Sequence, residues 1–136
     1  MFSGIIADLG VIVDRSPRGN GCTLLIETGF PIGGEDGIQL GDSIACNGVC
    51  LTAESLQPPH RFTVAAGKET LDCTTFGSLK AGDRLHMERA LQVNARLDGH
   101  IVKPRPGWQH AGGLQICENA VKPGFKLGKQ VHRARL

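Results

Sequence analysis

Five cysteines offer the most varied chemistry in this sequence, because a thiolate can bind a metal, attack an electrophile or enter a disulfide. They are Cys22, Cys46, Cys50, Cys73 and Cys117. Cys46 and Cys50 are spaced C-x3-C, but no second Cys or His pair completes a tetrahedral zinc site. The odd number also argues against a disulfide framework. We therefore expect free thiols, most of them buried, and no bound metal.

Charge is distributed unevenly along the chain. Residues 1–102 carry 8 Lys/Arg and 12 Asp/Glu, a net charge of −4, whereas residues 103–136 carry 7 Lys/Arg and 1 acid, a net charge of +6. Two prolines within Lys103–Gly107 disfavour regular structure where the composition changes. We predict a domain over residues 1–102 and a divergent basic tail over 103–136 that is irregular or disordered. A divergent native terminus, a shifted reading frame and a variant terminus remain open as its origin.

Short apolar runs separated by turn signals fill the first part of the chain. The predicted strands are Gly4–Val13, Cys22–Glu27, Ser43–Cys46, Cys50–Leu56, Phe62–Ala66 and Arg84–Ala90. Lys68–Cys73 has room for one helical turn, and Asn47-Gly48 suits the positive φ angles of a tight hairpin turn. Short strands at this spacing are typical of a closed antiparallel barrel.

Nothing in the sequence predicts a membrane partner. No stretch approaches the roughly 18 apolar residues of a membrane span. The N-terminus lacks the basic region of a secretory signal and reaches Asp8 early. We expect a cytoplasmic protein.

Five blocks of sequence occupy residues 1–102 in a fixed order. M-F-S-G-I-I opens the chain, G-D-S-I-A-C-N-G-V-C-L-T covers Gly41–Thr52, and K-E-T-L covers Lys68–Leu71. G-S-L-K-A-G-D then leads to M-E-R-A-L at Met87–Leu91, and G-H-I-V ends at Val102. Together, in this order and with these separations, the blocks resemble those of riboflavin synthase.

The resemblance implies an all-β fold, a six-stranded antiparallel Greek-key barrel, here followed by a short irregular C-terminal tail. It also implies a transferase of riboflavin biosynthesis. Members of that family convert two molecules of 6,7-dimethyl-8-ribityllumazine into riboflavin and a ribitylamino-pyrimidine, with no metal or organic cofactor. They have two such barrels and form oligomers, so we expect a dimer or a trimer.

The resemblance further implies a set of site residues. Those expected to bind the pteridine or flavin ligand are Gly4, Ile5, Ile6, Cys50, Leu51, Thr52, Ala65, Ala66, Gly67, Lys68, Glu69 and Thr70. Those expected to take part in catalysis are Ser43, Cys50 and His100, with Ser43 supplying or activating a hydroxyl nucleophile and His100 moving a proton. No metal ligand is expected.

The chain departs from the family pattern after Val102. Pro104 and Pro106 stand in the region where the family motif continues to a second histidine, and no second copy of the E-T-L block follows. Three functions therefore remain open. The first is riboflavin synthase activity, and the second is a single-barrel module that binds lumazine or flavin without turnover. The third, nucleic-acid binding by the basic tail, is disfavoured because residues 1–102 are acidic and only 4% of residues are aromatic.

Overall fold

The computed structural model of the chain describes residues 2–91, 108–111, 114–117 and 132–133. The strands of the first range are β1 (Asp8–Arg18), β2 (Gly21–Glu27), β3 (Ser43–Cys46), β4 (Val49–Gln57), β5 (Arg61–Ala66) and β6 (Arg84–Arg89). Between β5 and β6 lie a short helix, α1 (Lys68–Cys73), and a 3-10 turn, η1 (Thr75–Gly77). Among the described residues, no helix is long and apolar enough to cross a membrane.

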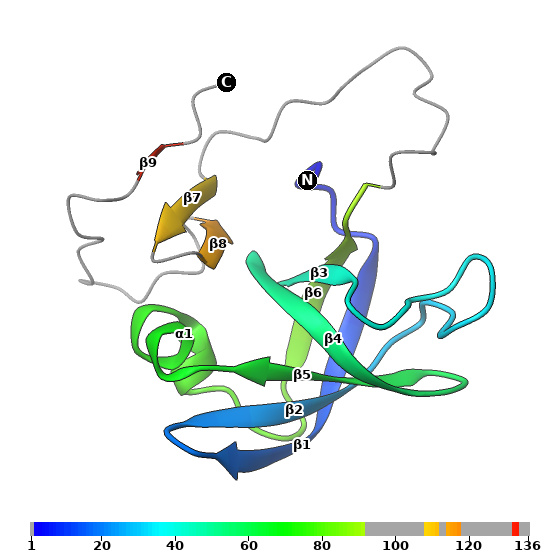
Figure 1. Cartoon of the computed structure of the whole chain (residues 1–136), viewed down its shortest axis with the longest axis horizontal. Helices are drawn as coiled ribbons and strands as arrows, with labels where there is room; N and C mark the ends of the chain where they lie inside the picture. Colours follow the sequence, from blue (N-terminus) through cyan, green and yellow to red (C-terminus); the bar gives the residue numbers. More distant parts are fainter. Residues whose placement is uncertain (1, 92–107, 112–113, 118–131, 134–136) are drawn as a thin grey trace.

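The six strands close into an antiparallel barrel. Neighbours follow the order β3-β6-β1-β2-β5-β4, and the pairing of β3 with β4 closes the ring (Figure 1). β2 lies beside β5 instead of β3, while β3, β4 and β5 follow one another as hairpins, which is a Greek-key connection. The predicted fold class is confirmed.

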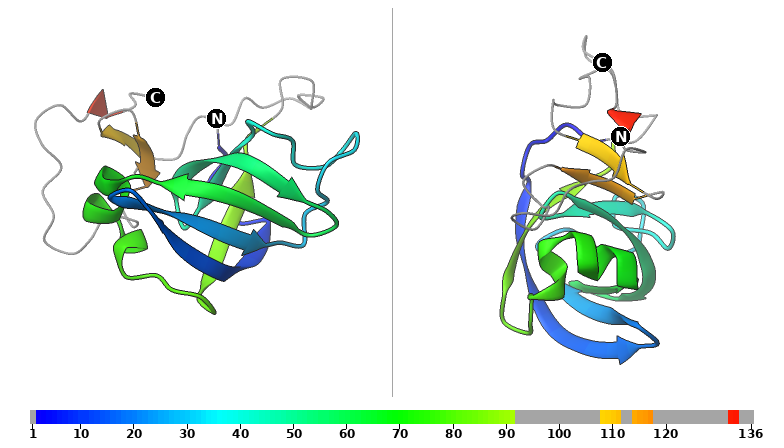
Figure 2. Two further views of the ribbon diagram at one scale, coloured as in Figure 1. Left: turned by 60° about the horizontal axis from the view of Figure 1, so that its bottom comes forward. Right: turned by 90° about the vertical axis from the view of Figure 1, so that its left-hand side faces the viewer.

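Strand alternation fills the inside of the barrel with apolar side chains. The largest fully buried side chains of this core include Phe62, Phe76, Leu24, Leu85 and Met87. α1 lies across one end of the barrel (Figure 2), with Thr70 and Cys73 buried. The hairpin turn between β4 and β5 lies at the other end (Figure 1).

The first strand is where the sequence prediction was wrong in its bounds. It was placed at Gly4–Val13, whereas β1 runs over Asp8–Arg18 and turns only at Gly19 and Asn20. The prolonged strand tolerates Pro17 because β6 pairs only with residues 8–11, which leaves this part of β1 with a free edge. Residues 4–7 lie outside the strand, and contacts other than strand pairing hold them in place.

Part of the basic tail has regular backbone structure. β7 (Trp108–Ala111) and β8 (Leu114–Cys117) form an antiparallel pair, and β8 meets the barrel where Ile116 pairs with Val49 of β4. A third short strand, β9 (His132–Arg133), pairs with β7. The predicted boundary between residues 102 and 103 lies outside the described residues, as does most of the tail that was expected to be irregular.

Candidate functional site

The β3–β4 hairpin brings three of the predicted site residues to one face of the sheet. In its register Ser43 is opposite Thr52, and Ala45 is opposite Cys50. Leu51 and its alternate neighbours in β4 enter the core, so Cys50 and Thr52 lie together on the outer surface. Because directly paired residues stand about 4.5–5.5 Å apart at Cβ, the Ser43 and Thr52 hydroxyls can contact one ligand.

Next to this face, β4 and β5 separate. Their ladder ends where Ala53 pairs with Val64, so residues 52 and 65 flank the point of separation. Ala65 is half-buried on the outer side, whereas the Ala66 side chain enters the core. Leu51 and Ala66 can therefore offer an outer ligand only their main-chain groups.

Gly67, between β5 and α1, is a glycine that the fold does not require. Its φ of −74° is accessible to any residue, and a Cβ added there would meet nothing within 4 Å. At Gly21 the same Cβ would lie 2.3 Å from the carbonyl oxygen of Ala66, so that glycine serves backbone packing. The open space at Gly67 leaves room beside its Cα for a flat ligand, while its carbonyl accepts a hydrogen bond from the Leu71 amide.

The remaining predicted residues of α1 divide between surface and interior. Glu69 is exposed and forms no hydrogen bond or ion pair with any described residue, whereas Lys68 forms an ion pair with Asp72 one turn later. The hydrogen bond and charge of Asp72 raise the pKa of Lys68 above its ordinary value. Thr70 is only 3% exposed, and its carbonyl accepts hydrogen bonds from the amide and hydroxyl of Thr74.

The N-terminal segment crosses the outside of the barrel near the hairpin. Phe2 is 1% exposed and packs with Ala45, Cys50 and Ala90. Beyond it, Ile5 and Ile6 are 59% and 53% exposed, an unusual degree for large apolar side chains. The predicted contacts from residues 4–6 thus lie on a segment that is anchored at Phe2.

The thiols of Cys46 and Cys50 stand in different environments although they are four residues apart. Cys46 is fully buried in the core, and burial, assisted by the nearby Cys50, raises its pKa to about 12. Cys50 is half-buried on the outer face. Cys46 therefore stays protonated and inert at neutral pH, and Cys50 is the thiol that a ligand or reagent can approach.

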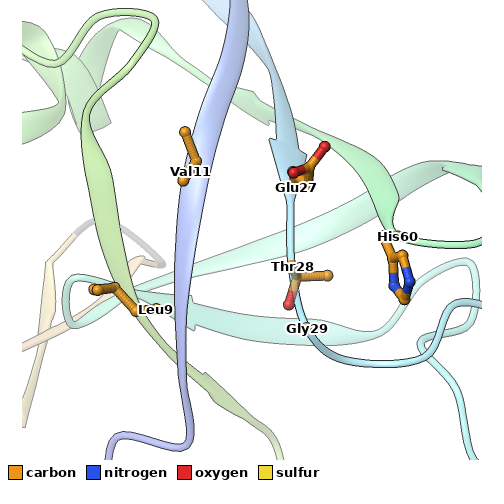
Figure 3. Close-up of a pocket in the computed structure, with 6 residues that line it drawn as sticks. All are labelled: Leu9, Val11, Glu27, Thr28, Gly29 and His60. Carbon is orange, nitrogen blue, oxygen red and sulfur yellow. The ribbon is translucent and has the colours of Figure 1, made fainter.

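Two hollows in the described part of the chain lie away from these residues. One, of about 290 Å³, is lined by Leu9, Val11, Glu27, Thr28, Gly29 and His60 (Figure 3). The other, of about 370 Å³, adjoins it around the β4–β5 turn and shares Glu27 and His60. Both are at the end of the barrel opposite α1, away from the predicted site.

Of the predicted residues, His100 lies outside the described residues, so its position relative to Ser43 and Cys50 stays a prediction. Within the described ranges, no group of three or more His, Cys, Asp or Glu side chains is placed to hold a metal ion.

One residue beside the site received no role from the sequence. Glu88 of β6 is only 6% exposed, and its carboxylate accepts hydrogen bonds from Ser3 and Gly4. It lies within the M-E-R-A-L block, but its outward-facing strand position predicts a solvated carboxylate. Only a contact between residues more than 80 positions apart reveals that it is buried.

The chain was compared with known proteins. Residues 3–90 match the model of the lumazine binding domain. Riboflavin synthase of Brucella abortus is 39% identical over 106 residues, which are 75% of this chain and 51% of that protein. The enzyme of Bacillus subtilis is 36% identical over 128 residues, 93% of this chain and 58% of that protein, so this alignment continues into the tail.

Riboflavin synthase of Mycobacterium bovis is 39% identical over 103 residues. The chain spans about half the length of the Brucella abortus enzyme. The matched family region contains every described site residue from Ser3 to Ala90, including the β3–β4 hairpin and the start of α1. The chain belongs to the lumazine binding domain family.

Proposed function

We propose that this chain binds 6,7-dimethyl-8-ribityllumazine and riboflavin on the outer face formed by β3, β4, the end of β5 and the start of α1. The family match covers all of these elements. The β3–β4 register, which puts Ser43, Cys50 and Thr52 on one surface, supports the placement. The curated relatives are named for the synthesis of riboflavin, and lumazine binding is the name of the matched domain.

The observation that carries the proposal is the open space beside the main chain of Gly67. A pteridine ring is flat and carries amide-like donors and acceptors along one edge, which backbone N–H and C=O groups can match. Small side chains at Cys50 and Ala65 leave room for the ring, while the Thr52 hydroxyl and the Glu69 carboxylate are available to the ribityl hydroxyls.

The proposed role in chemistry is that of one half of a riboflavin synthase site. The family reaction joins two lumazines, and the described barrel presents one such face. A second pteridine must then be held by another barrel, either in a second copy of this chain, as a dimer or trimer, or in a longer polypeptide. Ser43 and His100 are the proposed groups for nucleophile activation and proton transfer, and neither a metal nor an organic cofactor is proposed.

The test is a fluorescence titration of the 136-residue chain with riboflavin and with the lumazine, followed by an assay for riboflavin formed from lumazine. We expect saturable binding at micromolar ligand. Gly67→Ala should weaken binding about tenfold while changing the free energy of unfolding by less than about 1 kcal/mol. The reason is that the added Cβ meets no protein atom and occupies only space that the ligand would fill.

The matched control is Gly21→Ala, where the added Cβ meets the carbonyl of Ala66 and the fold itself must shift. Loss of stability at Gly21 with none at Gly67 separates a binding glycine from a structural one. Absence of any ligand-dependent fluorescence change with the wild-type chain would overturn the proposed function.

A further inference from the structure

Glu88 is a buried carboxylate on the outside of the barrel. β6 alternates in the expected way, with Leu85 and Met87 in the core and His86 exposed. Glu88 points outward, yet it is 6% exposed, because the N-terminal segment covers it. A charged group removed from water needs compensating hydrogen bonds, so its partners show what it holds in place.

Among the described residues, the hydrogen-bond partners of this carboxylate are two consecutive residues. One carboxylate oxygen accepts from the backbone amide and the hydroxyl of Ser3, the latter at 2.7 Å, and the other accepts from the backbone amide of Gly4 at 2.9 Å. Gly4 has a φ of 81°, a left-handed conformation in which glycine is favoured. Three charge-assisted hydrogen bonds thus fix a short segment that belongs to no strand.

The cross-strand register connects this anchor to the proposed ligand face. Glu88 is opposite Ala45, and Ala45 is opposite Cys50, so the three residues form one row across β6, β3 and β4. Ser3 and Gly4 bind at the Glu88 end of the row, and Phe2 forms a buried cluster with Ala45 farther along it, against which Cys50 packs. The N-terminal segment therefore lies along the row, with Phe2 beside the strand that carries Thr52.

We infer that Glu88 is a positioning residue for the pteridine site: by holding Ser3 and Gly4 it keeps Phe2 in place beside Ala45 and Cys50, on the ligand face. This inference rests on the proposed function. Glu88 itself is enclosed by the segment it holds and does not touch the ligand.

Glu88→Gln is the informative variant because it keeps the side-chain shape. An amide has one acceptor oxygen and an NH2 group, so the NH2 must face at least one donor that the carboxylate accepted. Phe2→Ala removes the packing on Cys50 without touching Glu88. Glu27→Gln is the matched control, a carboxylate that is paired with Arg61 on the surface and accepts no hydrogen bond from residues 2–7.

Two measurements are made on each full-length variant: the rate of Cys50 alkylation by iodoacetamide in the native protein, followed by peptide mass spectrometry, and the dissociation constant for riboflavin. Glu88→Gln should accelerate Cys50 alkylation and weaken riboflavin binding, each about tenfold. Glu27→Gln should leave both unchanged. The double variant Phe2→Ala/Glu88→Gln should match Phe2→Ala alone, because Glu88 acts through Phe2.

An unchanged alkylation rate in Glu88→Gln would overturn the inference, as would an unchanged riboflavin affinity in a wild-type chain that binds riboflavin. Additive effects in the double variant would also overturn it, because Glu88 would then act by a separate route. A uniform rise in alkylation of Cys22, Cys46 and Cys50 would mean global unfolding and would count against positioning. If the wild-type chain binds no riboflavin, the proposed function fails, while the Cys50 measurement still decides whether Glu88 holds Phe2.

Discussion

At the scale of single residues, alternation along β4 decides which side chains can do chemistry. Outward positions carry Cys50 and Thr52, and inward positions carry Leu51 and Ala53. The sequence block around Thr52 predicted these orientations, because apolar and polar residue types alternate there with the two-residue period of a strand. The same reasoning could not find Glu88, since its burial depends on a segment that sequence periodicity does not place.

Thr52 gives the sharpest test of the ligand face. Thr52→Val keeps the branched shape of an exposed strand residue and removes only the hydroxyl. We expect riboflavin affinity to fall by about 1–3 kcal/mol with no loss of thermal stability, measured by fluorescence titration and by melting. Glu69→Gln should have a similar effect. The control is Ser16→Ala, another exposed strand hydroxyl, on β1, and equal affinities for Thr52→Val and wild type would remove Thr52 from the site.

The buried thiol of Cys46 makes the stability of the folded chain depend on pH. Its pKa is raised to about 12 in the folded chain, so the unfolded chain loses this proton at lower pH and stability falls as pH rises above the ordinary thiol pKa of 9.0. Between about pH 9 and about pH 10, ionisation of this thiol in the unfolded chain should lower the free energy of unfolding by about 1 kcal/mol. Urea titrations should show a flatter pH dependence for Cys46→Ala, and an identical slope in both proteins would contradict the assignment.

At the scale of elements, the sequence predicted most strands within one or two residues and α1 at its observed bounds. Local signals carried these predictions, such as alternation in β2 and β5 and the turn pair Asn47-Gly48, which has φ angles of 48° and 80°. The start of β1 was misplaced because residues 4–7 are as apolar as a strand but are held by hydrogen bonds from the Gly4 amide to Glu88 and from the Ala7 amide to the Met87 carbonyl.

The β3–β4 turn is also a tertiary contact. The Asn47 side-chain oxygen accepts a 2.7 Å hydrogen bond from the amide of His86, which ties the turn to β6. Asn47→Gly keeps the left-handed backbone and loses this bond, so we expect a loss of about 1 kcal/mol in unfolding free energy. Asn47→Ala adds backbone strain and should lose about 2 kcal/mol. Chemical denaturation measures both, and equal stability of the two variants would argue against the strain.

At the scale of the whole molecule, the barrel closes without the tail. The pairing of β3 with β4 completes the ring, and β8 pairs with the barrel only at Val49 of β4. Removing residues 103–136 should therefore leave the melting temperature within about 3 °C of that of the full chain. A fall of 10 °C or more would show that the tail is part of the domain and that the predicted boundary is misplaced.

The central claim is that the ligand binds on the outer face near Gly67, at the barrel end opposite the hollows around His60. Backbone amide NMR of the full chain, titrated with riboflavin, tests it most directly. Binding at this face should give the largest chemical-shift changes at Cys50–Thr52 and Ala65–Glu69 and leave the shifts of Leu9, Thr28 and His60 unchanged. Shift changes centred on His60 and Leu9, or none at saturating riboflavin, would contradict it.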